Sequence, residues 1–145
     1  RCLYVTAEFL QVLGLTPMLG RLLTVADDRA GCEPRAVASH GFWQRQLGGD
    51  PAAVGKTITL NDRPTELVGA TPPAFTGLDV GRSFDIAVPV CAQEAWARGE
   101  NQLRNDELWW LTVMGRLPPG KALEVADAEL AALSPGLFRA TLPAR

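Results

Sequence analysis

Two stretches of the chain carry residue types that could do chemistry, and the first resembles a phosphate-binding loop. Residues 48–57 read GGDPAAVGKT, so glycines precede a Gly-Lys-Thr ending that could hold a nucleotide phosphate. Asp50 stands where that loop needs its first glycine, and its carboxylate would repel a phosphate. The stretch is also expected to join a helix to a strand, the reverse of the order that points a helix N-terminus at phosphates. We therefore interpret Lys56 and its neighbours as structural.

The second stretch, Val37 to Gly41, has the sequence setting of a hydrolase nucleophile elbow. Ser39 and Gly41 are correctly spaced, but Val37 replaces the first glycine of the Gly-x-Ser-x-Gly pattern. His40 is the only histidine and follows Ser39 directly, where it is badly placed to act as that serine's general base. Serine is a strongly preferred N-cap, so we interpret Ser39 as the cap of the helix that follows.

Metal ligands and acid–base pairs do not gather in the sequence either. One histidine, three dispersed cysteines and the Asp27-Asp28 pair match no known metal-ligand spacing. Asp27-Asp28 and Asp106-Glu107 lie in polar stretches, where we expect solvated or capping carboxylates. The sequence thus predicts no catalytic residue, no cofactor-binding residue and no metal site.

The cysteines leave the compartment open. Their number is odd and their spacing wide, so at most one disulfide can form and one thiol must remain. We expect all three to be unpaired, as buried cysteines often are. They are Cys2, Cys32 and Cys91.

Two adjacent tryptophans are the candidate contact residues. Trp109 and Trp110 fall in a stretch, 108–117, that alternates like a strand, so their side chains should point to opposite faces. If the sheet is covered on one face only, one indole meets solvent or a partner, whereas burial of both needs two covered faces. A partner contact through Trp109 or Trp110 and simple core packing both remain open.

The elements that must position these residues are short helices and strands. The clearest pattern is a β-hairpin, in which 56–60 alternates with period two, Asn61-Asp62 turns, and 63–71 returns. Pro64 indicates that the return strand lies at a sheet edge or begins with an unpaired position. We also expect a short helix capped by Thr6, an irregular segment at 24–34, strands at 36–39, 84–90 and 108–117, and helices at 40–47, 92–98 and 122–133, the last ended by Ser134-Pro135-Gly136.

Composition excludes several classes of protein. The chain has 145 residues, of which 47% are hydrophobic and 21% charged, so it can form a packed core. Its net charge of -2 offers no attraction for nucleic acid. No apolar run approaches the roughly 20 residues that cross a bilayer. Because the sequence begins with Arg1 and shows no signal peptide, we expect a fragment of a larger protein.

The order of the chain's motifs resembles one family. The motifs are Glu8–Gly14, Leu19–Arg21, Asp27-Asp28, Ala36–Ser39, Gly41–Arg45, Gly48–Pro51, Val54–Thr57, Leu67–Gly69, Asp85–Val90 and Gly115–Gly120. Together they resemble the periplasmic core domain of MacB-like, FtsX-type ABC transporter permeases, particularly the duplicated permease branch. Asn61-Asp62 departs from the usual Asn-Gly, Ala70 replaces a common valine, and Cys32 and Cys91 lie outside the family pattern, so no role carries over to them.

The resemblance implies a mixed α/β domain of the α+β class. Residues 1–90 would form an inserted β-hairpin lobe, and residues 91–145 part of a porter-like strand–helix lobe whose first half is missing. It also implies an extracytoplasmic, periplasmic position in an inner-membrane protein. The partners would be the permease's own transmembrane helices, a separate ATPase subunit or domain, and a periplasmic protein.

Three functions follow as hypotheses. The first is a non-catalytic domain that transmits conformational change from the membrane helices to a periplasmic partner or cargo. The second is a small-molecule or lipid-binding domain of the transporter, suggested by the apolar and aromatic content around Trp96, Trp109 and Trp110. The third, an enzyme using Ser39 or Lys56, lacks a complete site.

Overall fold

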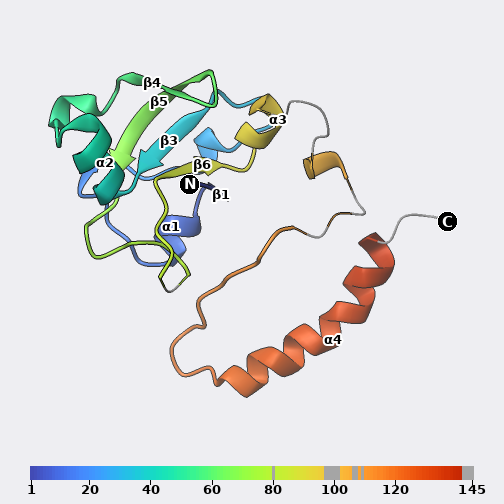
Figure 1. The fold of residues 1–145 in the computed structure, drawn as a ribbon. Helices are drawn as coiled ribbons and strands as arrows, with labels where there is room; N and C mark the ends of the chain where they lie inside the picture. Colours follow the sequence, from blue (N-terminus) through green and yellow to red (C-terminus); the bar gives the residue numbers. More distant parts are fainter. Residues whose placement is uncertain (80, 97–101, 106–107, 109, 142–145) are drawn as a thin grey trace. The chain divides into compact units, whose positions relative to one another are not determined.

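A computed structural model describes residues 1–79, 81–96, 102–105, 108 and 110–141 (Figure 1). Its chain divides into a first unit, Arg1–Gly99, and a second unit, Glu100–Arg145. Every strand of the described chain lies in the first unit, and the longest described helix lies in the second. The fold is mixed α/β, as the sequence predicts.

A mixed sheet organises the first unit. Its described strands are β1 (Cys2–Val5), β2 (Leu19–Gly20), β3 (Arg35–Ala38), β4 (Thr57–Leu60), β5 (Arg63–Ala70) and β6 (Ile86–Pro89). They run in the order β1-β6-β3-β5-β2, and β4 also pairs with β5. The β1–β6 and β3–β5 pairs are parallel, whereas β3–β6, β2–β5 and β4–β5 are antiparallel. β5 is thus an interior strand, with β3 along one side and β4 and β2 along the other.

Both faces of this sheet are covered. On one face, Ala36, Leu67 and Ile86 pack with Trp43 of α2 (His40–Leu47) and with Trp96 of α3 (Ala92–Trp96). On the other, Val37, Val68 and Ala87 pack with Leu10 of α1 (Phe9–Val12) and with Leu22, Leu23 and Phe84. Neighbouring residues of β3, β5 and β6 therefore alternate between two cores, which explains their nearly continuous apolar runs.

The stretch from β3 to β5 follows the sequence prediction closely. Ser39 caps α2 by accepting a hydrogen bond from Phe42 N at 3.1 Å, and Gly48 ends the helix with a φ of 65°. Asp50 then caps the 3-10 turn Pro51–Ala53. The hairpin turn has positive φ at both Asn61 (50°) and Asp62 (62°), the conformation that a two-residue turn needs to match the twist of its strands.

Pro64 does not mark an edge strand, so that part of the expectation is wrong. Pro64 pairs with Thr59 of β4, while the pairing of β5 with β3 begins only at Glu66. On the side of β5 that faces β3, Pro64 is unpaired near the start of the strand. This agrees with the alternative expectation of an unpaired position. β1 and β2 are strands that the sequence does not predict, and the two residues of β2 are too few to show a period.

Glycine allows β2 to approach β5 closely. A Cβ atom on Gly69 would lie 2.2 Å from the backbone oxygen of Arg21 and 2.7 Å from that of Leu19. Real Cβ atoms do not approach backbone oxygens so closely, so Gly69 is required by contact rather than by its own φ. β2 could not pair with β5 at this position if residue 69 were larger than glycine.

The second unit differs from its prediction in two ways. Its helix α4 runs from Leu123 to Thr141 and continues through Pro135, where an end is expected. The described residues of 108–117 form no strand, although their sequence alternates. A strand needs a neighbouring strand for its backbone hydrogen bonds, and alternation alone supplies none. Within the described residues, no helix is both long and apolar enough to cross a membrane.

Candidate functional site

Ser39 and His40 do not form a catalytic pair. Ser39 is 5% exposed, and its hydroxyl accepts the N-cap hydrogen bond of α2, which confirms its interpretation as a cap. The imidazole of His40 lies against the indole of Trp43, with ring centroids 5.8 Å apart. The serine oxygen is therefore engaged in helix capping and the histidine in ring packing.

The Gly-Lys-Thr segment also has a structural setting. The Lys56 ammonium lies 3.3 Å from the carboxylate of Asp50, and Asp50 accepts a further hydrogen bond from Ala52 N. These two hydrogen bonds lower the pKa of Asp50, the backbone bond from Ala52 being the stronger cause. A carboxylate sits where a phosphate would have to bind, and the segment leads into β4 rather than into a helix.

The tryptophan pair is only partly described. Trp109 lies outside the described residues. Trp110 is half-buried, and its Nε1 donates a hydrogen bond to the backbone oxygen of Gln102 at 3.3 Å within the second unit. Leu111 and Val113, which follow it, are 60% and 94% exposed. A partner contact through Trp109 and Trp110 stays a prediction.

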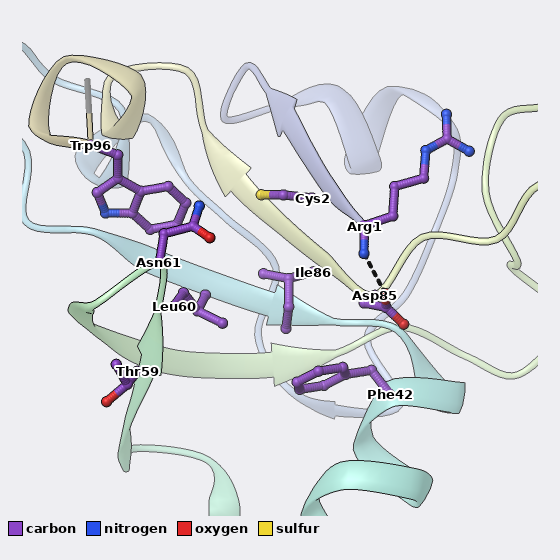
Figure 2. A pocket seen from close by; sticks show the side chains of 9 residues that line it. All are labelled: Arg1, Cys2, Phe42, Thr59, Leu60, Asn61, Asp85, Ile86 and Trp96. Atoms are coloured by element: carbon purple, nitrogen blue, oxygen red, sulfur yellow. Dashed lines mark hydrogen bonds and ion pairs between the residues drawn. The ribbon is translucent and has the colours of Figure 1, made fainter. Parts of the chain in front are cut away.

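A cavity of about 220 Å³ opens beside Trp96, the other tryptophan for which the sequence suggests ligand binding (Figure 2). Its apolar wall consists of Phe42, Leu60, Ile86 and Trp96, which come from α2, β4, β6 and α3. Thr59, Asn61 and Asp85 add polar groups, and the thiol of Cys2 also lines it. Burial raises the pKa of that thiol to about 11, so Cys2 stays protonated and weakly nucleophilic near neutral pH.

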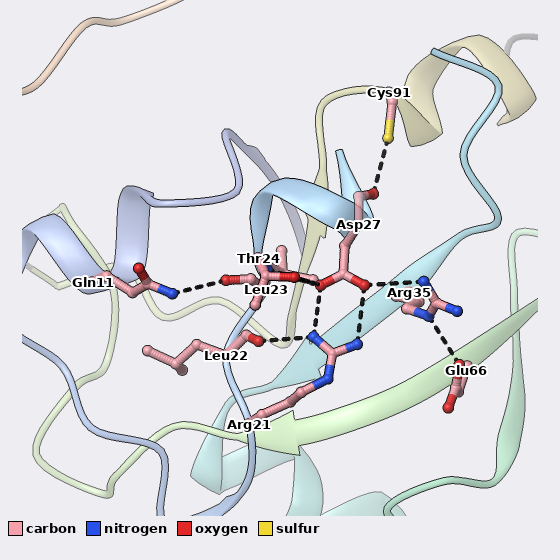
Figure 3. Close-up of polar contacts among 9 residues, drawn as sticks. All are labelled: Gln11, Arg21, Leu22, Leu23, Thr24, Asp27, Arg35, Glu66 and Cys91. Atoms are coloured by element: carbon pink, nitrogen blue, oxygen red, sulfur yellow. Dashed lines mark hydrogen bonds and ion pairs between the residues drawn. The ribbon is translucent and has the colours of Figure 1, made fainter. Parts of the chain in front are cut away.

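Charged and polar side chains gather around Asp27 in the first unit (Figure 3). The Asp27 carboxylate is 1% exposed and accepts two hydrogen bonds from Arg21, at 2.6 and 2.9 Å, and one from Arg35 at 3.0 Å. Thr24 adds its backbone N–H and its hydroxyl. Arg35 in turn bonds Glu66 of β5 at 3.0 Å. The cluster joins the segment between β2 and β3 to the sheet.

Burial alone would raise the pKa of Asp27, but the hydrogen bonds from Arg21 and Thr24 outweigh it. They hold the pKa of that carboxyl well below its ordinary value, so Asp27 is charged near neutral pH. Of the two roles expected for Asp27, solvated or capping, the structure shows the capping role, since its carboxylate accepts a hydrogen bond from Thr24 N. The sequence offers a weak signal in hindsight: Thr24 and Asp27 have capping-box spacing, and the structure forms that box.

Asp28 and a disulfide bind the same segment to the end of β6. The Asp28 carboxylate accepts hydrogen bonds from Ala7 N at 3.2 Å and from Cys91 N at 3.0 Å. Cys91 forms a disulfide with Cys32, 59 residues away in sequence, while Cys2 remains free. The expectation of three unpaired cysteines is wrong, because sequence spacing cannot show that the segment at 24–34 returns to residue 91. In a chain-entropy view, closing such a loop stabilises the fold by about 4 kcal/mol.

A family comparison decides what kind of domain carries these features. The model described as the MacB-like periplasmic core domain matches residues 1–133. The chain belongs to this family. The fold agrees with the match, since two solved structures resemble it over nearly its whole length. None of the curated proteins matches the sequence significantly.

The first solved structure is the periplasmic region of MacB from Actinobacillus actinomycetemcomitans, with a TM-score of 0.62 and 18% identity. The match covers 94% of this chain and 56% of that one. The second is a domain of a putative permease protein from Porphyromonas gingivalis, with a TM-score of 0.53 and 22% identity, covering 94% and 58%. This MacB-like domain thus spans a little more than half the length of each, and at these identities the likeness concerns the fold.

The charged side chains described for this MacB-like periplasmic core domain make contacts within the fold. Among the described residues, no three His, Cys, Asp or Glu side chains are grouped to hold a metal ion. The described polar clusters pair their charges internally, as Asp27 does with Arg21 and Arg35. What the arrangement provides is a sheet buried on both faces, with its long connecting segment fastened by ion pairs and a disulfide.

Proposed function

We propose that this chain is a non-catalytic extracytoplasmic domain of an ABC transporter permease, and that it transmits conformational change from the membrane helices to a periplasmic partner or cargo. The observation that carries the proposal is the match of residues 1–133 to the MacB-like periplasmic core domain. The name of the first solved neighbour, a periplasmic region of MacB, supports the same location. ATP would be hydrolysed by a separate subunit or domain.

The construction of the first unit suits such a role. A domain transmits motion well when it moves as a rigid body, and rigidity follows from dense packing on both faces of a sheet. The Asp27 cluster and the Cys32–Cys91 disulfide fasten the segment between β2 and β3, whose only described helix is the short 3-10 turn Val25–Asp27. We expect the first unit to keep its internal distances while the permease works.

Distances between spin labels in the intact permease test this. Labels at Arg45 and Arg63, which are exposed and lie on α2 and β5, should keep their separation between nucleotide-free and ATP-trapped states. Labels placed at Arg63 and on a membrane helix should change their separation. Labels that do not depend on cysteine are needed, because the chain holds three. Constant distances in both pairs would refute transmission, and an equal change within the first unit would refute rigid-body movement.

A partner contact through the second unit can be tested in the same permease. A photo-crosslinking residue at Trp110 should capture a periplasmic protein, whereas one at Arg63 should not. Capture at both positions would indicate unspecific proximity and count against a contact at Trp110. An enzymatic role predicts a different result: the permease would show a measurable turnover that Ser39→Ala or Lys56→Ala abolishes.

Binding of a small molecule or of part of a lipid is a second candidate, favoured by the cavity beside Trp96. The Nε1 donor of Trp96 is buried and has no hydrogen-bond partner among the described residues, so it could serve a ligand's acceptor. The cavity holds about 220 Å³, below the roughly 300–1,000 Å³ of sites for drug-sized molecules. Only a fragment-sized ligand, or one end of a longer one, fits.

Tryptophan fluorescence distinguishes the two candidates. Titration of the permease with short-chain lipids or small aromatic compounds should produce a saturable change that is lost in Trp96→Phe. Trp43→Phe serves as the matched control, because Trp43 lies in the same core cluster and does not line the cavity. No saturable change, or one that survives Trp96→Phe, would leave transmission as the remaining function.

A further inference from the structure

The Cys32–Cys91 disulfide attaches the loop of residues 29–33 to the rest of the first unit. Residues 29–33 connect the Asp27-Asp28 pair to β3, and their backbone makes a local turn through Cys32 N and Arg29 O. No hydrogen bond or ion pair among the described residues joins 29–33 to another element. Asp28 fastens the chain just before this loop, and the Pro34 oxygen, which accepts from Glu66 N, fastens it just after. The disulfide is therefore the loop's own attachment to the fold.

The two cysteine residues differ in exposure. Cys32 is partly exposed and is flanked by the exposed residues Gly31 and Glu33, whereas Cys91 is 8% exposed at the end of β6. A thiolate must reach a disulfide sulfur to attack it, so exchange is directed to Cys32. Cys91 is then the sulfur that leaves.

The surroundings of Cys91 suit a released thiol. Its Sγ lies 3.3 Å from the backbone oxygen of Asp27, a distance at which an S–H group can donate a hydrogen bond (Figure 3). Its backbone N–H is held by the Asp28 carboxylate at 3.0 Å, independently of the disulfide. Cys91 can therefore stay in place after the bond opens.

From these observations we propose that Cys32 is a site of thiol–disulfide exchange with an extracytoplasmic dithiol oxidoreductase, which opens and closes the attachment of residues 29–33. This goes beyond the proposed function, and it shares with it only the extracytoplasmic location, where disulfides form and persist. The core is untouched by the exchange, since Asp27, Asp28 and both faces of the sheet keep their contacts.

The exchange balances in two steps. A thiolate of the oxidoreductase attacks Cys32 Sγ and forms a mixed disulfide, while the Cys32–Cys91 bond breaks and the Cys91 sulfur leaves with its electron pair and takes a proton. The second thiol of the oxidoreductase then attacks the mixed disulfide, becomes part of the oxidoreductase's own disulfide, and releases the Cys32 thiol. Two electrons and two protons pass from the oxidoreductase to this chain, and the reverse steps close the bond.

Trapping the mixed disulfide in the intact permease tests the site. A thioredoxin-type oxidoreductase in its reduced state, with its second cysteine replaced by serine, stops after the first step. Mass spectrometry should find the adduct on Cys32. An adduct on Cys91 or Cys2, or an oxidoreductase that leaves the Cys32–Cys91 bond intact, would overturn the proposal. Cys2→Ser is the matched control and should change nothing, because the Cys2 thiol takes no part.

Hydrogen exchange tests the consequence. Reduction of the wild-type permease, or Cys32→Ser, should speed exchange of the amide at position 32, which donates to Arg29 O, at least about tenfold, while β3 and β6 stay more protected than this loop. Exchange in β3 and β6 as fast as in the loop would show that reduction unfolds the core, and would overturn the proposal. If the permease proves not to transmit motion, these results are unaffected, so the two proposals fail separately.

Discussion

At the scale of single residues, one buried carboxylate, that of Asp27, links several segments of the first unit. Asp27 is charged inside the protein because Arg21, Arg35 and Thr24 together satisfy its oxygens. Both arginines remain partly exposed, so the cluster does not require three charges to leave water completely. Such a group stabilises the fold only while its carboxylate is ionised, which makes its contribution depend on pH.

We predict that Asp27→Asn destabilises the chain by about 2–4 kcal/mol at pH 7, because it removes the charge that two arginines face. The pKa of Asp27 is lowered in the folded state, so its stabilising contribution is complete above the unfolded pKa, near 4, and is lost as the pH falls toward the folded pKa. The difference between wild type and Asp27→Asn should therefore shrink between about pH 5 and pH 2. Urea unfolding at several pH values measures it.

Asp79→Asn is the control for this experiment. Asp79 is exposed and bonds Arg1, which also lowers its pKa. Its replacement should cost clearly less than Asp27→Asn at every pH. A difference between wild type and Asp27→Asn that stays constant down to pH 2 would contradict the ionised, buried carboxylate.

A second residue-scale prediction concerns Gly69. The substitution Gly69→Ala should destabilise the chain by about 1–3 kcal/mol, because the added methyl group meets the backbone of Leu19 and Arg21 and β2 must move. Gly115→Ala should be nearly neutral, since nothing lies within 4 Å of its added Cβ. Thermal unfolding of both variants measures the effect of this contact on stability. Equal losses of stability in the two variants would contradict it.

At the scale of elements, the helix α2 and the β4–β5 hairpin show how local signals define structure. α2 has a serine cap, a left-handed glycine at its end and Trp43 on its buried side, so three independent signals agree. The hairpin turn likewise forms with Asn-Asp in place of Asn-Gly, because Asn and Asp tolerate positive φ better than most residues. Elements with such signals are predictable without knowledge of their neighbours.

The cap of α2 is testable on its own. Ser39→Ala should destabilise the chain by about 1 kcal/mol, because the N–H of Phe42 loses its acceptor in a buried site. Ser83→Ala should change stability by less than about 0.5 kcal/mol, since Ser83 is exposed and caps no helix. Chemical denaturation of both variants compares them. Equal effects would contradict the capping role of Ser39.

At the scale of the whole molecule, the two units differ in how completely they bury their apolar residues. α4 has no buried residue, and its apolar side chains Leu123, Leu130, Leu133 and Leu137 are 60–62% exposed. Isolated helices gain little stability without tertiary packing, and Pro135 removes one backbone hydrogen bond. The first unit, in contrast, has apolar cores on both faces of its sheet.

We therefore predict that the 145-residue chain exchanges the amide hydrogens of α4 at least about 100-fold faster than those of β3 and β5. If the proposed permease setting holds, the same helix should be protected in the intact permease, where other segments can cover its leucines. Hydrogen exchange read by mass spectrometry compares the two preparations. Similar exchange of α4 in both would contradict this, as would protection of α4 equal to that of β3 in the chain alone.

The division into an inserted lobe at 1–90 and a porter-like lobe at 91–145 stays a prediction. The contacts divide the chain at Gly99 instead, because α3 packs its Ala92 and Trp96 into the core of the sheet. An evolutionary lobe and a compact unit need not share a boundary, since the first reflects descent and the second reflects contacts.

The sequence by itself determined the hairpin, the capped helix α2, the strands β3 and β6, and the family. Each of these depends on local spacing: Ser39 before a helix, Asn61-Asp62 between two alternating runs, and an ordered series of motifs. These signals reside within a few neighbouring residues, so they can be read without knowing which distant segments meet.

Only the tertiary structure decided the features that join distant segments. The disulfide pairs Cys32 with Cys91, Asp27 gathers Arg21 and Arg35, and β1 pairs with β6 across some 80 residues. Composition gave no sign of these, because a charge or a thiol looks the same in sequence whether it meets water or a partner. At 108–117 the error runs the other way. The alternating sequence predicts a strand, but its described residues form none, because a strand needs another strand beside it. Long-range pairing is a property of the packed chain, and burial decides it.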